Sequence, residues 1–442
     1  MEALALNGGQ AEGERTRAHS TICRHCGLLQ TVPGMTAPAV AVCTRCGVAL
    51  RRVRRNPFGR SLAMTLTALA CFAIACTMPL MRVSTSGITL AANLFSGPRR
   101  LDQQGVWELA LVVLFTTVAA PFLKLIGTAY VLIGLSLPRP PRHSRSVFAW
   151  VERMRPWAMV EVYLIGVFVA YVKLIDIVHI DVGYAVFALV GMMLATVAAD
   201  ATLDRQAVWE ALERRGTGSD ASAPASGDVS APADGDASAR REVLLACETC
   251  DKVSVASGKG PHHCRRCGSR LHARKPDGIA RCWALVIAAF ILYIPANVYP
   301  VLTVVQLGSG MPSTILGGVE ELITARMYPL AAIVFLASIM VPMLKLIGLM
   351  LLLVMTQLRR SERLVDRVRL YRIVSVIGRW SMIDIFMESI LVALVQFGAI
   401  VTIEPGVGAV AFAGVVIITI FAAESFDPRV MWDMANSGSR SA

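Results

Sequence analysis

Eight of the eleven cysteines fall into four Cys-x-x-Cys pairs, which combine into two sets of four. The sets are Cys23, Cys26, Cys43 and Cys46, and Cys247, Cys250, Cys264 and Cys267. Four thiolates brought together by two such pairs form the closed tetrahedral site that structural zinc accepts. Iron in a rubredoxin-like site would use the same sulfurs, so spacing does not separate the two metals. We predict two structural four-cysteine sites, with zinc as the expected metal and iron left open.

Two lysines lie inside long apolar segments, where a charged side chain is a functional hypothesis by default. Lys124 and Lys345 occupy matching sequences, and Lys345 precedes Arg359 by 14 residues, which places it about 20 Å from that end of a helix. The candidate acidic partners are Glu161 and Asp384. Counting along the helices leaves Asp384 about 13 Å from the depth of Lys345. A direct contact between Lys345 and Asp384 therefore remains a hypothesis.

Hydroxyl groups accompany both lysines. A proline three residues before each lysine releases the carbonyl of a hydroxyl-bearing residue four positions earlier, and these residues are Thr117 and Ser338. Thr196 and Thr419 belong to the last apolar segment of each half. Isolated hydroxyls in membrane helices usually bond to their own helix, but the recurrence favours a polar cluster. The predicted cluster consists of Ser338, Lys345, Asp384 and Thr419, with Thr117, Lys124, Glu161 and Thr196 as first-half counterparts.

The composition requires these residues to be positioned by membrane helices. The chain has 442 residues, 55% hydrophobic and 17% charged, whereas soluble domains have about 25% charged residues. A segment of about 20 apolar residues spans a membrane as a helix. Such segments occur at residues 59–81, 106–137, 157–178, 182–203, 279–303, 327–358, 380–402 and 405–424. We therefore predict an all-α polytopic membrane protein with eight transmembrane helices, and a soluble enzyme is excluded.

Arginines predict the orientation, since cytosolic loops are rich in Lys and Arg. They cluster before the first span, after the second and after the sixth, and the opposite loops contain few. We expect both termini and the cysteine modules in the cytosol. The net charge of +12 is thus explained by topology, and we expect no nucleic-acid partner. No P-loop, Ser/His/Asp or His-Glu-x-x-His pattern occurs, so no enzymatic activity is expected.

The chain contains an internal repeat. Pro121-Phe-Leu-Lys-Leu-Ile-Gly127 recurs as Pro342-Met-Leu-Lys-Leu-Ile-Gly348. Four spans are an even number, so the two four-helix repeats should enter the membrane with the same orientation. The predicted domains are a disordered N-terminus (1–18), zinc ribbon 1 (19–56), transmembrane repeat 1 (57–210), a flexible linker (211–241), zinc ribbon 2 (242–276), transmembrane repeat 2 (277–427) and a C-terminal tail (428–442).

Taken together, the doubled arrangement and three motifs resemble the paraquat-inducible protein A family. The motifs are Pro-x-Leu-Lys-Leu, Trp380-Ser-Met-Ile-Asp384 and Glu424-Ser-Phe-Asp-Pro-Arg429. The resemblance extends from about residue 20 to residue 435. The first half departs from the pattern, with Glu161 in place of Asp and with Thr202-Leu-Asp204-Arg-Gln-Ala at its end. If only one half carries a polar site, these departures favour the second.

The resemblance implies a function in lipid transport. The family implies an inner-membrane protein of Gram-negative bacteria that works with a periplasmic MCE-domain partner, which forms a hydrophobic tunnel, to move phospholipids between the inner and outer membranes. Two alternatives stay open from the residues themselves. One is an ion- or proton-coupled permease for a small molecule, using the same lysines and acidic residues as a relay, and the other is a membrane redox protein with iron in the ribbons.

Overall fold

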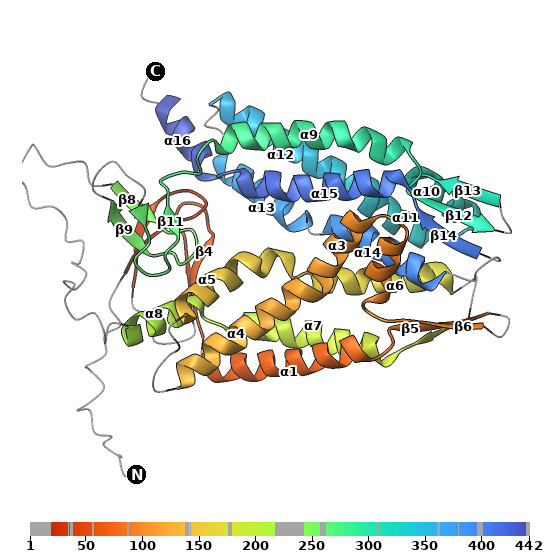
Figure 1. The fold of residues 1–442 in the computed structure, drawn as a ribbon. Coiled ribbons are helices and arrows are strands. Elements are labelled where there is room, and N and C mark those ends of the chain that lie inside the picture. Colours follow the sequence, from red (N-terminus) through yellow and green to blue (C-terminus); the bar gives the residue numbers. More distant parts are fainter. Residues whose placement is uncertain are drawn as a thin grey trace, which may run out of the picture.

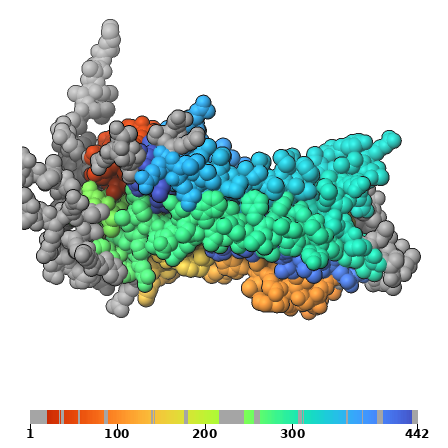
Figure 2. Space-filling model, turned by 90° about the horizontal axis from the view of Figure 1, so that it is seen from above, coloured from red at the N-terminus to blue at the C-terminus, as the bar shows by residue number. Residues whose placement is uncertain are grey.

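The computed structural model describes residues 19–33, 35, 39–54, 57–85, 88–137, 141, 143–175, 179–216, 243–256, 262–306, 309–359, 363–378, 380–395 and 401–438. The molecule is elongated (Figures 1 and 2). Two small cysteine modules lie at one end, which we call the ribbon end, and two three-stranded sheets lie at the other, the sheet end. The predicted disordered N-terminus and most of the predicted linker lie outside the described residues.

The first half of the helical body comprises residues 57–216. Its helices are α1 (Pro57–Thr77), α2 (Ser96–Gln103), α3 (Trp107–Leu114), the π-helix η1 (Phe115–Ala119), α4 (Ala120–Ser136), α5 (Ser144–Met154), the 3-10 helix η2 (Arg155–Trp157), α6 (Val160–Leu174), α7 (Tyr184–Thr202) and α8 (Arg205–Gly216). Helices α1 and α7 pack along each other. The last helix, α8, extends beyond the predicted end of repeat 1 at residue 210 and lies at the ribbon end.

The second half comprises residues 278–438 and contains a comparable series of elements. They are α9 (Gly278–Val298), α10 (Ile315–Thr324), α11 (Tyr328–Phe335), the π-helix η3 (Leu336–Met340), α12 (Val341–Gln357), α13 (Leu364–Ile377), the 3-10 helix η4 (Trp380–Met382), α14 (Ile383–Leu394), α15 (Val407–Ser425) and α16 (Arg429–Gly438). Here α9 and α15 pack along each other. Residues 429–438, predicted as part of a tail, form α16.

Seven helical runs among the described residues are long and apolar enough to cross a membrane. They are Pro57–Thr77, Trp107–Ser136, Ser144–Leu174, Tyr184–Thr202, Gly278–Val298, Tyr328–Gln357 and Val407–Ser425. The predicted span at 380–402 is not among them: its described helix α14 has only 12 residues, and residues 396–400 lie outside the described part of the chain. Ten of those residues are buried inside the protein. A helix that is apolar on all sides reads the same in sequence whether protein or lipid surrounds it.

A three-stranded antiparallel sheet closes each half at the sheet end. The strands are β5 (Met81–Thr85), β6 (Ile88–Ala92) and β7 (His179–Val182) in the first half, and β12 (Leu302–Gln306), β13 (Ser309–Ser313) and β14 (Val401–Pro405) in the second. Glycines permit the tight join between each sheet and its helices. A Cβ on Gly183 would lie 2.0 Å from the Pro79 carbonyl oxygen, and one on Gly406 would lie 2.1 Å from that of Pro300.

The two halves meet through α14, which packs against α6 and α2 of the first half. Tyr163 and Phe386 form an edge-to-face pair with ring centroids 5.5 Å apart, an arrangement worth about 0.5–1.5 kcal/mol beyond the buried area. Gly166 allows this approach, because a Cβ there would lie 3.0 Å from the Phe386 Cβ. One continuous hydrophobic core includes residues of both halves.

Each cysteine module consists of two β-hairpins. The first contains β1 (His19–Ile22), β2 (Leu29–Val32), β3 (Ala39–Val42) and β4 (Ala49–Val53), and the second contains β8 (Val243–Ala246), β9 (Val253–Ala256), β10 (His262–His263) and β11 (Arg270–Leu271). We call them ribbon 1 and ribbon 2. Each Cys-x-x-Cys pair forms the turn between a strand and its partner, so both pairs of a ribbon meet at one edge.

Candidate functional site

All four Cys-x-x-Cys turns have the same backbone geometry. The amide of the first cysteine bonds to the carbonyl five residues later, and the amide four residues later bonds back to the first cysteine, with N···O distances of 2.8–3.0 Å. The residue after the second cysteine needs a left-handed backbone, and glycine supplies it at Gly27, Gly47 and Gly268 because it lacks a Cβ. Asp251 takes this role in the remaining turn, at φ 58°.

The turns gather the predicted cysteines into two clusters that could hold a metal ion. In each cluster the four sulfurs lie within 4.8 Å of one another, and the closest Sγ–Sγ distances are 3.4–3.5 Å. Tetrahedral zinc with Zn–S bonds of about 2.3 Å needs a similar sulfur separation. The donor set therefore fits a thiolate-bound metal.

Each ribbon docks mainly on the opposite half of the helical body. The Arg45 guanidinium of ribbon 1 lies 4.1 Å from the centre of the Trp432 ring on α16, and the ribbon 1 cysteines share a hydrophobic core with α9, α12 and α16. The ribbon 2 cysteines share a core with α4, α5 and α8. Arg24 and Asp251 join the two ribbons through an ion pair. The ribbons therefore tie the halves together at the end of the molecule opposite the sheets.

Glu213 on α8 anchors ribbon 2 to the first half. Its carboxylate forms ion pairs with Lys252 and with Arg266, the latter at 2.6 Å. Burial alone would raise the pKa of Glu213, but the hydrogen bond from Lys252 and the charge of Arg266 outweigh burial and lower it. The carboxylate is thus held in its charged form across the neutral range. Ribbon 2 also reaches the second half, since Glu248 pairs with Arg429 at 3.1 Å.

Lys124 is paired, but with a residue that the sequence analysis did not select. Its Nζ lies 2.9 Å from Asp200 Oδ2 on α7, and Arg155 lies 3.4 Å from the same oxygen. The proposed partner Glu161 lines the same small cavity of about 120 Å³ without forming this bond. The pairing of Lys124 with Glu161 is therefore corrected. Asp200 lies four residues after Thr196 on the same helix, and that helical spacing was the available signal.

Lys345 also has a different partner from the predicted one, Asp384: it bonds to Thr419. Its side chain is buried, with an exposed fraction of 2%, and its Nζ donates to Thr419 Oγ1 over 3.0 Å. Thr419 in turn donates to the Val416 carbonyl of its own helix. The structure thus joins two members of the predicted cluster, Lys345 and Thr419. It places Asp384 and Ser338 elsewhere.

Asp384 and Ser338 line a cavity of about 390 Å³ near the sheet end of the second half. The Asp384 carboxylate on α14 interacts with the Ser338 hydroxyl of the π-helix η3. Its Oδ2 atom is buried and has no hydrogen-bond partner among the described residues. The walls are mainly apolar side chains of α10, α11, α14, α15 and the sheet, including Leu322, Val334, Met387, Leu391 and Phe412. We call this space the sheet-end cavity.

Three charged residues that the sequence analysis missed line the same cavity: Lys173, Glu321 and Glu388. Glu388 lies one helical turn after Asp384 on α14, and its Oε1 atom is buried without a hydrogen-bond partner among the described residues. Lys173 enters the cavity from α6 of the first half. The i, i+4 spacing of Asp384 and Glu388 in an apolar segment was the signal for Glu388. Lys173 lies close to the end of its helix, where snorkelling would explain it.

The remaining hydroxyl residues divide into two kinds. Thr117, in the π-helix η1, donates to the Val113 carbonyl over 2.7 Å, which is the local bond expected of an isolated threonine. Thr196 lines the small cavity beside Lys124, and its buried Oγ1 has no hydrogen-bond partner among the described residues. Both η1 and η3 immediately precede a helix with proline at its second position. Such π-helical turns frequently mark functional sites.

The sequence profile described as paraquat-inducible protein A matches residues 58–213 and 279–436. The chain belongs to this family. Both matched stretches consist of the helical body, and each begins shortly after a ribbon. The family assignment and the four-cysteine clusters therefore rest on different parts of the chain, and both were expected from the sequence.

Curated relatives match over nearly the whole chain. The chain is 30% identical to the lipophilic envelope-spanning tunnel protein A of Escherichia coli, over 94% of this chain and 92% of that protein. It is 32% identical to the intermembrane transport protein PqiA of the same organism, over 94% and 96%. A probable intermembrane transport protein of Haemophilus influenzae is 24% identical, over 93% and 95%. No solved structure gave a significant match.

Proposed function

We propose that this family member is the inner-membrane subunit of a bacterial phospholipid-transport system. It works with a periplasmic MCE-domain tunnel protein, loading phospholipid into the tunnel or receiving phospholipid from it. The names of its relatives as intermembrane transport proteins support this function. The single structural observation that carries the proposal is the sheet-end cavity. Its volume of about 390 Å³ lies within the range of ligand pockets, about 300–1,000 Å³.

The chemistry of the sheet-end cavity suits an amphipathic ligand. Leu322, Val334 and Leu391 supply apolar contacts for acyl chains. The charged groups that could meet a headgroup are Lys173, Glu321, Asp384 and Glu388. Burying such charges is costly unless they are paired or exchange protons. The unpartnered oxygens of Asp384 and Glu388 therefore favour a site completed by a ligand or a proton. The hydrogen bond between Lys345 and Thr419 joins α12 to α15 in the same half.

The proposed topology places the ribbons and both termini in the cytosol and the sheet-end cavity at the periplasmic side. The arginine-rich connectors support this orientation. We propose eight membrane segments in two tandem four-helix repeats, with the buried α14 belonging to the seventh, and the domain boundaries given above. The two sheets, the two π-helices and the paired packing of α1 with α7 and α9 with α15 support the repeat.

We propose that the two clusters hold zinc and act as closed structural sites. Four sulfurs fill the coordination sphere of zinc and leave no open position for a reacting ligand. Bound metal would brace each ribbon against the half on which it docks. The contact of Arg45 with Trp432 and the ion pair of Lys252 with Glu213 would then hold the ordered ribbons against α16 and α8.

A coupled permease for a small molecule is the second candidate function. The observation that favours it is a set of ionisable groups inside the helical body. Lys345 and Glu388 are buried, and Asp384 has one buried carboxylate oxygen; chains of such residues carry protons in transporters. This alternative needs no tunnel partner. Uptake of a small molecule into liposomes that contain only this protein would support the permease and count against the lipid-transport proposal.

The direct test is affinity purification of the tagged protein from its native membrane, followed by mass spectrometry of the proteins and lipids that co-purify. We expect an MCE-domain protein together with phospholipid. A matched purification of the Met387→Trp variant, whose larger side chain fills the sheet-end cavity, should retain the protein partner and lose the lipid. Recovery of wild-type protein without either would contradict the proposal.

A further inference from the structure

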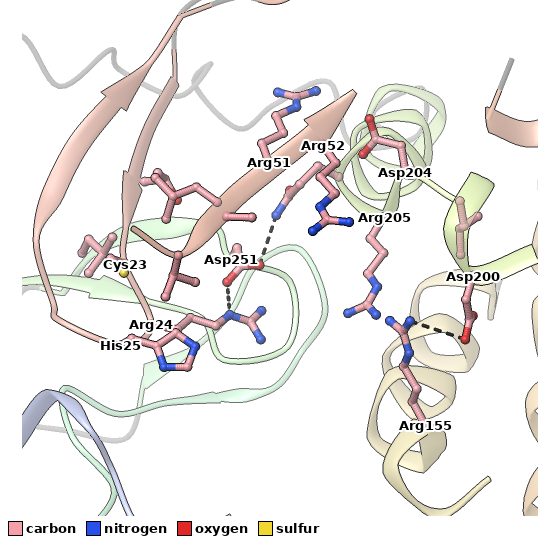
Figure 3. Close-up of a pocket in the computed structure, with 17 residues that line it drawn as sticks. Cys23, Arg24, His25, Arg51, Arg52, Arg155, Asp200, Asp204, Arg205 and Asp251 are labelled. Atoms are coloured by element: carbon pink, nitrogen blue, oxygen red, sulfur yellow. Dashed lines mark hydrogen bonds and ion pairs between the residues drawn. The ribbon is translucent and has the colours of Figure 1, made fainter. Parts of the chain in front are cut away.

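A second cavity, of about 420 Å³, lies at the ribbon end where the two ribbons meet the first half of the helical body. It is lined from β1 and β4 of ribbon 1, from the junction of α5 and α6, from the start of α8 and from ribbon 2. We call it the arginine cavity (Figure 3). It shares no lining residue with the sheet-end cavity. We propose that it is a binding site for a phosphate group.

The arginine cavity concentrates positive charge in a confined space. Its lining arginines come from four separate elements of the fold and are Arg24, Arg51, Arg52, Arg155 and Arg205. These five arginines outnumber the three carboxylates that line the cavity, which are Asp200, Asp204 and Asp251. Glu210 and Glu152 pair with Arg51 and Arg205 from outside the lining. An anionic ligand would therefore be attracted to the cavity and would neutralise its excess charge.

Arg52 is the least committed of these cations. Arg24, Arg51 and Arg205 each form an ion pair, with Asp251, Glu210 and Glu152 respectively. No ion pair of Arg52 occurs among the residues that the structure describes, and its side chain is exposed on β4. Figure 3 shows the guanidinium groups of Arg52, Arg155 and Arg205 directed into the same space. A ligand in that space could accept hydrogen bonds from all three.

The arrangement of donors favours phosphate over other anions. Guanidinium groups bind phosphate and carboxylate oxygens through two parallel hydrogen bonds. A carboxylate is planar and offers two oxygens on one side, whereas a phosphate group offers oxygens in tetrahedral directions. Arginines that approach from β4, from the α5–α6 junction and from the start of α8 require acceptors on several sides. A phosphate group meets this requirement with one ligand.

The position of the arginine cavity allows two sources for the phosphate group. Arg155 and Asp200 belong both to this cavity and to the small cavity around Lys124, which reaches into the helical body. A phospholipid headgroup could therefore approach along the helices, and a soluble phosphate could enter between the ribbons. The chemistry of recognition is the same for both. The site goes beyond lipid handling in the sheet-end cavity and does not depend on it.

Calorimetric titration of the full-length purified protein in a zwitterionic detergent tests the inference. Two probes are used separately at constant ionic strength: inorganic phosphate and dihexanoylphosphatidylglycerol below its micelle concentration. We expect one saturable site for at least one probe. Binding by the lipid alone identifies a headgroup as the ligand, and tighter binding of inorganic phosphate identifies a soluble source.

Variants connect the binding to the cavity. We expect Arg52→Gln combined with Arg205→Gln to weaken the binding at least tenfold, whereas Arg52→Lys should weaken it less because the charge is kept. Arg281→Gln is the matched control, since Arg281 is exposed on α9 and does not line the cavity. Unchanged zinc content and gel-filtration volume establish that each variant is folded. Absence of saturable binding for both probes, or equal binding by the double variant, would overturn the inference.

Discussion

Lys345 and Thr419 form a buried hydrogen bond of 3.0 Å between α12 and α15. In the first half the corresponding lysine, Lys124, reaches the carboxylate of Asp200 at 2.9 Å. The two halves therefore satisfy the same kind of buried lysine differently, by a neutral hydroxyl in one and by a charge in the other.

The hydroxyl of Thr419 should contribute more to the free energy of unfolding than its bond to its own helix does, because it also accepts from Lys345. Thr419→Val leaves the Lys345 amine buried without a partner, so we expect the free energy of unfolding to fall by about 1–3 kcal/mol. Adding Lys345→Met should recover part of that loss. Thr356→Val is the matched control, because Thr356 is equally buried and bonds only to its own helix. Denaturant unfolding in detergent measures the free energy of unfolding of the wild type, the two threonine variants and the double variant. Equal effects of the two threonine variants would show that Lys345 does not depend on Thr419.

Asp200 should stabilise Lys124 where Glu161 does not. Asp200→Asn removes the charge shared by Lys124 and Arg155, and we expect a loss of about 1–2 kcal/mol in unfolding free energy, since the carboxylate is partly exposed. Glu161→Gln should change stability by less than about 0.5 kcal/mol. Thermal unfolding of both variants makes the comparison. A larger effect from Glu161→Gln would restore the pairing that the sequence suggested.

The sequence predicted the parts of the molecule whose signals are local. The Cys-x-x-Cys pairs predicted both four-cysteine clusters, and apolar run length predicted seven of the spans that the structure contains. Residues 380–402 are not among these helical runs in the described part of the chain, because α14 has only 12 residues. Ten of the 12 are buried by protein, and composition alone does not record which neighbours a helix has. The family was also predicted correctly, from motifs that lie in both halves.

Contacts between distant segments could not be predicted in the same way. Counting along one helix gave the depth of Asp384 but not the direction of its side chain, which faces Ser338 and not Lys345. The crossed docking of the ribbons also left no local signal, since Arg45 and Trp432 are remote in sequence. The i, i+4 spacing from Asp384 could have predicted Glu388 as a site residue. Lys173 could be found only by knowing how α6 packs against α14.

Metal removal should release one ribbon at a time. We expect the wild-type protein to contain two zinc ions, and Cys26→Ser to contain one. Because ribbon 1 packs on α16, amide hydrogen exchange should accelerate most in α16 of this variant and less in α8, which ribbon 1 contacts through the ion pair of Arg51 with Glu210. Cys71→Ser is the control, as Cys71 belongs to neither cluster. Two zinc ions in the Cys26→Ser protein, or iron in the wild type, would contradict the assignment.

The attachment of ribbon 2 should depend on pH through Glu213. Its folded-state pKa lies below the ordinary value of 4.5, so its contribution is complete above that value and is lost as the pH falls through the folded-state pKa. Because the group is partly exposed, we expect only about 0.5–1 kcal/mol. Glu213→Gln should remove this contribution at neutral pH and accelerate hydrogen exchange in β8 and β9. Unchanged exchange would show that Lys252 and Arg266 do not hold the ribbon.

The central claim is that phospholipid passes through the sheet-end cavity. The most direct measurement follows isotopically labelled phospholipid between the two membranes of cells that carry either wild-type protein or Met387→Trp. Met387 lines the cavity, and Ile291→Trp on the exposed face of α9 is the control. We predict that Met387→Trp slows the exchange to the rate of a deletion strain at normal protein levels, while Ile291→Trp exchanges at the wild-type rate. Wild-type exchange in cells with Met387→Trp would contradict the account.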